Sequence, residues 1–255
     1  MPAHLFDLTG RVAVVTGGAT GLGLGMVEAL TSMGCTVSIW GRRPDVVAKA
    51  AAATGASSQV VDVADKDAVD AAFAAELEAH GRVDGMFANA GIADPRAPSL
   101  NRSTEDWRRV MAVNVEGVAY CFRAAAVHMR ERAKNGDPFG RLVGTSSVAS
   151  IMGAAYNEHY GASKGAVNSM VRALAVEYGR YGVTVNAILP GFARSEMTED
   201  LLKEERLVAA ALPRVPLGRF GEPDDYGGIA AYLMSDASKY HTGQCFTIDG
   251  GYSIF

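Results

Sequence analysis

Short apolar runs alternate along the chain with longer segments in which apolar residues recur at helical spacing. The runs are rich in β-branched residues, which predicts buried strands at 11–16, 36–40, 59–63, 83–88, 141–145, 183–189 and 244–248. The segments between them predict helices at 22–33, from 44 onward, 65–80, 103–133, 157–181 and 223–234. Strands that alternate with helices throughout predict a parallel sheet with helices on both faces. We therefore expect a three-layer, doubly wound α/β fold around a seven-stranded parallel sheet.

The 255 residues contain no composition break, linker or internal repeat, so we predict one domain spanning residues 1–255. With 49% hydrophobic and 20% charged residues, the chain has enough apolar side chains for a sizeable core, which excludes a disordered protein. The segment after the sixth strand, about 190–215, is irregular and rich in loop signals. We expect it to form the substrate-binding loop of that domain.

Net charge, cysteine usage and hydropathy narrow the class further. The net charge is −4 and no basic block appears, which argues against a nucleic-acid partner. Cys35, Cys121 and Cys245 are far apart, so neither a disulfide framework nor a metal site is expected. The first residues lack a signal-peptide pattern, and no run reaches about 18 consecutive apolar residues. These features predict a cytoplasmic protein without a membrane partner.

A glycine-rich turn follows the first strand directly. It reads Thr16-Gly-Gly-Ala-Thr-Gly-Leu-Gly23, and its candidate ligand-binding residues are Gly17, Thr20, Gly21, Leu22 and Gly23. Glycines allow backbone N–H groups to approach a pyrophosphate, and the following helix directs its positive end toward it. The spacing differs from the strict G-x-G-x-x-G fingerprint, and a plain tight turn is the alternative. Its place after the first strand of an α/β pattern favours dinucleotide binding, as in a Rossmann fold.

Tyr160 and Lys164 are four residues apart on a predicted helix, so the phenol and the ammonium share one face. A nearby cation would lower the pKa of the tyrosine toward the range useful for acid–base catalysis. Ser146 and Ser147 follow the fifth strand, at the edge where open α/β sheets carry their active sites. Taken singly, each feature also fits a solvated helix face or an ordinary turn.

In this order the motifs resemble those of the short-chain dehydrogenase/reductase family, in its single-domain branch of about 250 residues. The resemblance extends from Thr16 to Gly251. It rests on the glycine turn, on the Asn-Ala-Gly turn after the fourth strand, on the helix asparagine, on the Tyr-x-x-x-Lys pair with a serine thirteen residues before it, and on a Pro-Gly pair after the sixth strand. Apart from the glycine turn, these features are, in this sequence, the turn Asn89, Ala90 and Gly91; the helix residue Asn114; the pair Tyr160 and Lys164; the serine Ser147; and the pair Pro190 and Gly191.

The resemblance implies an NAD(P)-dependent oxidoreductase that interconverts a secondary alcohol and a ketone, of class EC 1.1.1. Tyr160 would act as the acid or base, and Ser147 would hold the substrate oxygen. Lys164 would bind the nicotinamide ribose and lower the pKa of Tyr160, and Asn114 would hold a water for proton relay. It also implies a homotetramer.

The residues after the second strand bear on the choice of cofactor. Gly41 stands where NAD-type relatives carry an aspartate, and Arg42 follows it. A guanidinium suits a ribose 2′-phosphate, so the sequence favours NADP(H), although a solvated turn arginine and NAD(H) remain alternatives. The glycine turn lacks the basic residue of many NADP-type relatives. Asp62, after the third strand, resembles the residue that hydrogen-bonds the adenine in relatives, with Val63 beside it.

The substrate is expected to be a small alcohol or ketone that contacts Ser147, Tyr160 and Phe192, the last in the loop after Pro190 and Gly191. Two other functions remain open. The same motifs permit a 3-oxoacyl-thioester reductase that acts on an acyl carrier protein. The second alternative is a protein that senses dinucleotides without turnover, although such proteins commonly lose the tyrosine or the lysine.

Overall fold

The computed structural model describes residues 5–94 and 96–255. The prediction that the chain has no signal peptide rests partly on residues 1–4, which lie outside the described residues. The described part of the chain forms a seven-stranded, wholly parallel sheet in the order β3-β2-β1-β4-β5-β6-β7. Its strands are β1 (Val12–Thr16), β2 (Thr36–Gly41), β3 (Ser57–Val60), β4 (Gly85–Ala88), β5 (Gly140–Thr145), β6 (Val183–Pro190) and β7 (Cys245–Ile248).

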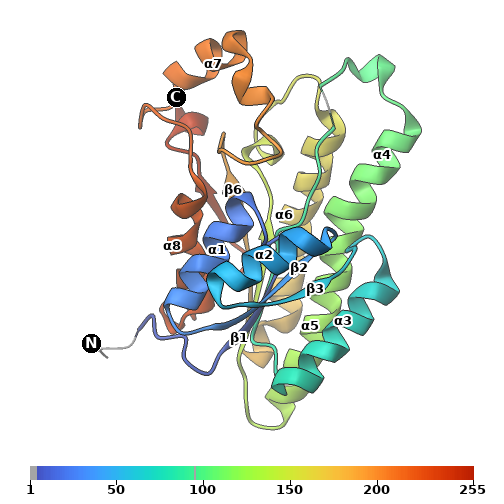
Figure 1. The fold of residues 1–255 in the computed structure, drawn as a ribbon, viewed down its shortest axis with the longest axis vertical. Helices are drawn as coiled ribbons and strands as arrows, with labels where there is room; N and C mark the ends of the chain where they lie inside the picture. Colours follow the sequence, from blue (N-terminus) through green and yellow to red (C-terminus); the bar gives the residue numbers. More distant parts are fainter. Residues whose placement is uncertain (1–4, 95) are drawn as a thin grey trace.

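Helices cover both faces of this sheet, so the predicted doubly wound Rossmann architecture is confirmed (Figure 1). The helices are α1 (Gly21–Ser32), α2 (Pro44–Thr54), α3 (Lys66–His80), α4 (Thr104–Met111), α5 (Gly117–Lys134), α6 (Glu158–Tyr178), α7 (Glu205–Ala211) and α8 (Gly227–Met234). α1, α2 and α8 pack on one face, and α3, α5 and α6 pack on the other.

The apolar runs form strands because the sheet is buried on both faces. In β1 every residue is buried, and its side chains alternate between two cores. Ala13 and Val15 pack with α1 and α8, whereas Val14 packs in the core under α5 and α6. This two-sided burial explains why the sequence shows continuous apolar runs instead of an apolar–polar alternation.

Several predicted elements differ from the structure, among them β4, which begins at Gly85 instead of residue 83. β3 covers Ser57–Val60 instead of 59–63, because Asp62 accepts a hydrogen bond from Ala64 N–H and turns the chain toward α3. The helix expected over 103–133 is interrupted at Ala112–Glu116 by a π-helical turn. The segment 190–215 is not wholly irregular, since Leu207, Val208 and Ala211 of α7 pack in a small apolar cluster with Phe220.

The helical stretch Thr104–Lys134 is, by length and composition alone, long and apolar enough to cross a membrane. Half of its most apolar window is buried inside the fold. Core helices of soluble proteins pass the same test, and α5 packs against α3, β4 and β5.

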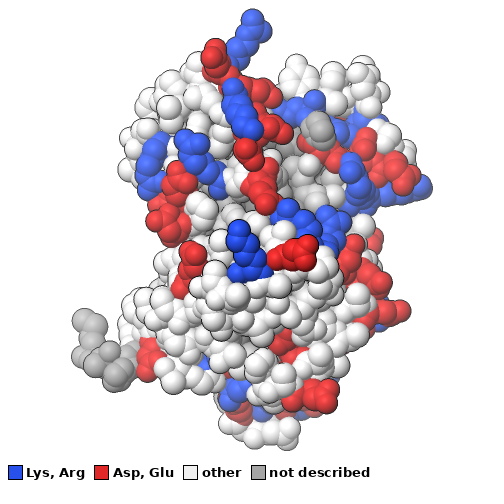
Figure 2. Space-filling view, in the orientation of Figure 1, with Lys and Arg blue, Asp and Glu red and all other residues white. Residues whose placement is uncertain are grey.

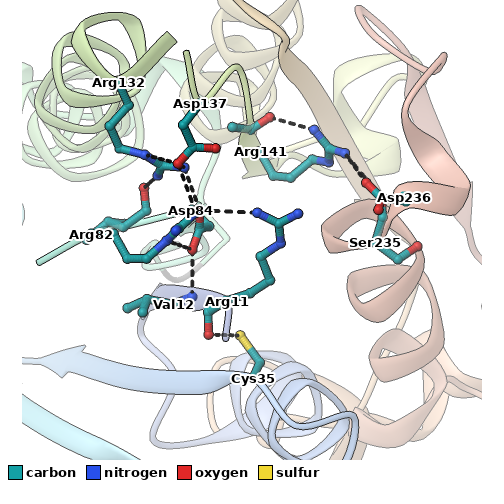
Figure 3. A network of polar contacts seen from close by, with 12 residues as sticks. Arg11, Val12, Cys35, Arg82, Asp84, Arg132, Asp137, Arg141, Ser235 and Asp236 are labelled. Carbon is teal, nitrogen blue, oxygen red and sulfur yellow. Dashed lines mark hydrogen bonds and ion pairs between the residues drawn. The ribbon is translucent and has the colours of Figure 1, made fainter. Parts of the chain in front are cut away.

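At the amino ends of the strands, the buried residue Asp84, just before β4, joins β1 through its carboxylate and its backbone and joins β5 through its backbone (Figure 3). Asp84 is fully buried, and its side chain accepts hydrogen bonds from the Val12 N–H at 3.0 Å and from the Arg82 guanidinium at 2.6 and 2.8 Å. Arg132 Nη2 lies 2.9 Å from the same carboxylate. The Asp84 backbone bonds to Val12 O and to Arg141 N–H. Burial alone would raise the pKa of Asp84, but the hydrogen bonds and the arginine charges outweigh it and lower the pKa below its usual value.

We expect Asp84→Asn to lower the free energy of unfolding at pH 7 by about 2–4 kcal/mol, because it removes the buried charge that the partly exposed guanidinium groups of Arg82 and Arg132 surround. The folded-state pKa of Asp84 is lowered, so its contribution is present above about pH 4, the unfolded value, and is lost as pH falls further. Urea unfolding at pH 7 and at pH 3–4 measures both effects.

The matched control is Asp70→Asn, which removes the carboxylate of an exposed ion pair with Lys66. It should change the unfolding free energy by less than about 1 kcal/mol. Equal losses in the two variants would contradict the assigned role of Asp84.

Candidate active site

A cavity of about 460 Å³ lies at the carboxyl ends of the strands. That volume is within the range of small-molecule and cofactor sites. It is lined by most of the residues that the sequence singled out: Gly17, Thr20, Gly21, Leu22, Gly23, Arg42, Asp62, Val63, Asn89, Ala90, Gly91, Ser147, Tyr160, Lys164, Pro190 and Gly191. Parallel strands all point the same way, so turns that are distant in sequence meet at this edge.

The glycine turn forms one wall. Gly17 and Gly21 have positive φ values of 63° and 53°, and a Cβ on Gly23 would lie 2.3 Å from Gly17 O. Helix α1 starts here without a side-chain cap and without an acidic residue in its first turn. Its first N–H groups and its positive dipole end therefore suit an anion such as a pyrophosphate.

The turn after β4 locks this wall to its neighbours. Thr16 Oγ1 accepts the backbone N–H groups of Asn89 and Ala90 at 3.0 and 2.9 Å. The Asn89 amide donates to Thr16 O and Gly17 O, and its oxygen accepts the Thr145 hydroxyl at 3.0 Å. Asn89 thus couples the glycine turn to β5, and the backbone from Thr16 to Gly17 is held rigidly.

Ser147 and Tyr160 both line the cavity, and the Ser147 hydroxyl is close enough to the phenol to lower its pKa. Ser147 caps the short turn after β5, and its Oγ also accepts Ala149 N–H at 3.1 Å. The neighbouring Ser146 is buried and donates its hydroxyl to Lys164 O at 2.9 Å. Both serines line the cavity, but the hydroxyl of Ser146 is used to hold the backbone of α6, whereas that of Ser147, thirteen residues before Tyr160, lies near the phenol.

Lys164 is buried, and its Nζ donates to Thr145 O at 2.8 Å and lies 5.6 Å from the centroid of the Tyr160 ring. Burial lowers the pKa of Lys164 to about 8. Burial also raises the pKa of Tyr160, an effect that the nearby Ser147 hydroxyl opposes without reversing it. The direction for Tyr160 is opposite to the one expected from its spacing to Lys164, because desolvation of the phenolate dominates when the ammonium is directed at Thr145.

Asn114 lies behind the cavity, in the π-helical turn between α4 and α5, and is fully buried. Its side-chain amide donates to Ile92 O at 2.9 Å and to Ser163 Oγ at 3.1 Å, and its oxygen accepts Ile92 N–H at 2.8 Å. Ser163 in turn donates to Tyr160 O. Both amide hydrogens of Asn114 are thus used to join the segment after β4 to helix α6.

Phe192 does not line this cavity in the described part of the chain. Its ring packs against Phe220 and Tyr252, with centroids 5.8 and 5.2 Å apart. Arg194 of the same loop pairs with Glu222 at 3.0 Å. Apolar contacts on the far side of the loop therefore decide where Phe192 points, which its position after Pro190 and Gly191 does not reveal.

Several cavity residues were not assigned to the cofactor or catalytic site from the sequence. Arg43 and Glu196 face each other across the cavity and form an ion pair of 2.6 Å. Behind the wall, His159 is buried with Nε2 3.1 Å from Asp94 Oδ2, consistent with a structural role. The doublet Arg42-Arg43 was visible in the sequence, but no local signal pairs its second residue with a loop more than a hundred positions away.

The surface around the site carries both charges. Figure 2 shows acidic and basic side chains interspersed over α2 and the segments above it, with no large patch of one sign on this face. At the cavity, Arg42 Nη1 lies 3.9 Å from Asp62 Oδ2, and both side chains are about half exposed.

The sequence and the fold match known proteins over almost their whole length. Residues 17–253 match the sequence profile of a family described as enoyl-(acyl carrier protein) reductase. The chain is 34% identical to 2,5-dichloro-2,5-cyclohexadiene-1,4-diol dehydrogenase of Sphingobium indicum, covering 97% of this chain and 98% of the relative. It is 36% identical to the NADP-dependent (R)-specific alcohol dehydrogenase of Lentilactobacillus kefiri, with coverage of 96% and 98%. It is 34% identical to 3-oxoacyl-[acyl-carrier-protein] reductase of Synechocystis, with coverage of 97% and 99%.

Two solved structures show the same agreement. The crystal structure of gox2181 superimposes with a TM-score of 0.95 at 29% identity, covering 100% of both chains. A candidate 2-deoxy-D-gluconate 3-dehydrogenase of Agrobacterium tumefaciens with bound NADP superimposes with a TM-score of 0.89 at 34% identity, covering 98% of this chain and 99% of that one.

We expect the buried lysine to leave a pH signature on stability. The pKa of Lys164 is about 8 in the folded protein and about 10.4 in an unfolded chain, so between these values unfolding takes up a proton and stability rises with pH. Lys164→Met should remove this rise. Chemical unfolding from pH 7 to pH 10.5 measures it, with Lys49→Met, an exposed lysine of α2, as the control that keeps the wild-type slope. Parallel curves for wild type and Lys164→Met would contradict the prediction.

Proposed function

The chain belongs to the short-chain dehydrogenase/reductase family, and we propose that within it the protein prefers NADP(H) over NAD(H) and acts through Tyr160, Ser147 and Lys164. It is an NAD(P)-dependent oxidoreductase that interconverts secondary alcohols and ketones, as its named dehydrogenase relatives are, and falls in class EC 1.1.1. The observation that carries the proposal is the meeting of Ser147, Tyr160 and Lys164 on one wall of a cavity whose other wall suits a pyrophosphate.

We assign the acid–base step to Tyr160. A bound nicotinamide cofactor would supply or accept the hydride at the substrate carbon. The Tyr160 hydroxyl would donate its proton to the carbonyl oxygen in reduction, or take the hydroxyl proton in oxidation. The Ser147 hydroxyl, which lines the same cavity as that phenol, would hold the same oxygen and stabilise charge on it.

Lys164 and Asn114 would support this step. The raised pKa of Tyr160 favours the neutral phenol, which is the proton donor that reduction needs. Proton removal in oxidation needs the Lys164 ammonium near the phenol, where it would stabilise the phenolate. In this structure the ammonium donates to Thr145 O, and binding of a ribose by Lys164 would bring it closer to the phenol. For Asn114 we propose mainly a positioning role. Both side-chain amide hydrogens of Asn114 already donate to protein atoms, so a proton-relay water would bind only to the oxygen atoms of Asn114.

The proposed preference for NADP(H) rests on Arg42 and on the absence of a carboxylate at Gly41. The residues expected to hold the cofactor are the glycine turn, Arg42, Asp62, Val63, Asn89 to Gly91, Pro190 and Gly191, all of which line the cavity. The kefiri relative is NADP-dependent by name, and the Agrobacterium structure contains NADP. Both support a 2′-phosphate site beside Arg42.

We further propose that residues 1–255 act as one domain with a substrate-binding loop at about 190–215, and that the protein is a cytoplasmic homotetramer. The substrate is a small alcohol or ketone. The net charge of −4 and the mixed surface charges support a function without nucleic acid. We propose that it acts without a membrane, with the Thr104–Lys134 helix serving as a core helix.

A 3-oxoacyl-thioester reductase is the second candidate function, and the Synechocystis relative favours it. An acidic carrier protein needs a basic surface at the cavity mouth, whereas charges of both signs lie on the face in Figure 2. A dinucleotide sensor without turnover is less well supported, because Tyr160, Lys164 and Ser147 are all present and lie close together.

We expect Tyr160→Phe to lower kcat by about 100- to 10,000-fold, because the change removes the proton-transferring hydroxyl and keeps the ring. Steady-state absorbance of the nicotinamide with a panel of ketones, alcohols and 3-oxoacyl thioesters measures it. Tyr156→Phe is the matched control, four residues earlier and half exposed outside the cavity, and should keep wild-type kcat. Unchanged turnover in Tyr160→Phe would refute its assignment.

The cofactor preference has its own test. Arg42→Asp should raise the KM for NADPH by about tenfold or more and leave the KM for NADH within a few-fold, because a carboxylate repels a 2′-phosphate but accepts a 2′-hydroxyl. Lys49→Asp makes the same charge change on the exposed face of α2 and should leave the ratio unaltered. A ratio that stays constant in Arg42→Asp would exclude Arg42 as the phosphate ligand.

A further inference from the structure

An ion pair bridges two walls of the cavity that are distant in sequence. Arg43 directly precedes α2, on the side of β2, and Glu196 belongs to the loop after β6. Arg43 Nη2 lies 2.6 Å from Glu196 Oε2, and both residues line the cavity. The pair therefore joins the loop expected to cover the substrate to the wall expected to hold the adenosine ribose.

The loop that carries Glu196 is fixed at its base and compact at its tip. At the base, Arg194 N–H donates to Gly221 O at 2.8 Å, and Gly221 N–H donates to Phe192 O. At the tip, Thr198 Oγ1 accepts Ser195 N–H at 3.0 Å and donates to Ala193 O. The carboxylate of Glu196 thus sits on an internally hydrogen-bonded turn, and its bond to Arg43 ties that turn to the α2 side of the cavity.

The chemistry of this pair matches the chemistry expected at the same place. A guanidinium binds a carboxylate and a phosphate with the same donors. Arg43 follows Arg42, the proposed ligand of the 2′-phosphate, and its guanidinium is occupied by Glu196. The two side chains of the pair are 57% and 55% exposed, so the pair is weak enough for a doubly charged phosphate to displace the carboxylate.

We propose that Glu196 is a specificity-determining residue for the cofactor. It occupies Arg43 until a ribose 2′-phosphate takes its place, and the exchange releases the loop at 194–203. A cofactor without the phosphate offers Arg43 no replacement, so the loop stays tied to the α2 side. This inference rests on the proposed preference for NADP(H) and adds a residue that gates it, on the wall opposite the arginines.

The test uses two fragments that differ only in the phosphate, adenosine 2′,5′-bisphosphate and adenosine 5′-monophosphate, titrated calorimetrically into the full chain at low salt. Glu196→Gln removes the competing charge at nearly constant shape. It should raise affinity for the bisphosphate by roughly 2–5-fold and leave affinity for the monophosphate unchanged. Glu199→Gln is the matched control, because Glu199 is on the same loop, is exposed, pairs with Lys203 and lies outside the cavity lining. It should change neither affinity.

Amide hydrogen exchange at 194–203 gives an independent readout. The bisphosphate should accelerate exchange there in the wild type, the monophosphate should not, and Glu196→Gln should exchange fast without ligand. Equal affinities of wild type and Glu196→Gln for a still-preferred bisphosphate would overturn the role of Glu196 and leave the NADP(H) preference standing. If Glu196→Gln gained equally for both fragments, the phosphate-specific exchange would be wrong. If neither protein preferred the bisphosphate, the NADP(H) preference and this inference would both fall.

Discussion

The parallel sheet reverses its strand order between β1 and β4, and this reversal is the constraint on which the candidate site depends. On either side of β1 and β4 the connections run in opposite directions, so the turns after these strands diverge and leave a crevice. The glycine turn fills one side of the crevice and the Asn89–Gly91 turn the other, joined by Thr16 Oγ1. Ser147 and the first turns of α6 then close the crevice on the β5 side, so one topological feature brings together residues from positions 17 to 198.

Burial acts on the site in two directions. It withdraws Lys164 almost fully and Tyr160 partly from water, which penalises the charged form of each and favours a neutral phenol beside a weakly basic lysine. It also keeps both groups where a bound ribose or substrate can change their protonation. The same desolvation is offset at Asp84, where hydrogen bonds and two guanidinium groups outweigh it. The two ionisable centres therefore differ in their pairing. Asp84, at the amino ends of the strands, is surrounded by hydrogen-bond donors and guanidinium groups, whereas Lys164 and Tyr160, at the cavity, have no oppositely charged partner among the described residues.

Much of this arrangement was predictable because its signals are local. Each buried strand is recognisable as an apolar run. The glycine turn and the Tyr160–Lys164 pair each indicate their expected chemistry within a segment of at most eight residues. The failures share a different cause. The end of β3 depends on one Asp62 hydrogen bond, α7 depends on a cluster with Phe220, and the direction of Phe192 depends on Tyr252. The pKa direction of Tyr160 depends on where the Lys164 ammonium points. Such tertiary contacts join distant residues and leave no periodic trace in one sequence.

The Asp84 cluster lies at the amino ends of the strands and the cavity at their carboxyl ends, so the two are separated by the full length of the strands. Energetic anchoring at the amino edge leaves the carboxyl edge free to vary in its loops. Substitutions that reshape the segment after β6 can accumulate without loosening the central strands. A fold built this way is suited to acquiring new substrates by changes in a single segment, and a laboratory effort to redirect this enzyme should confine its diversity to 192–215, beyond the Pro190 and Gly191 expected to hold the cofactor.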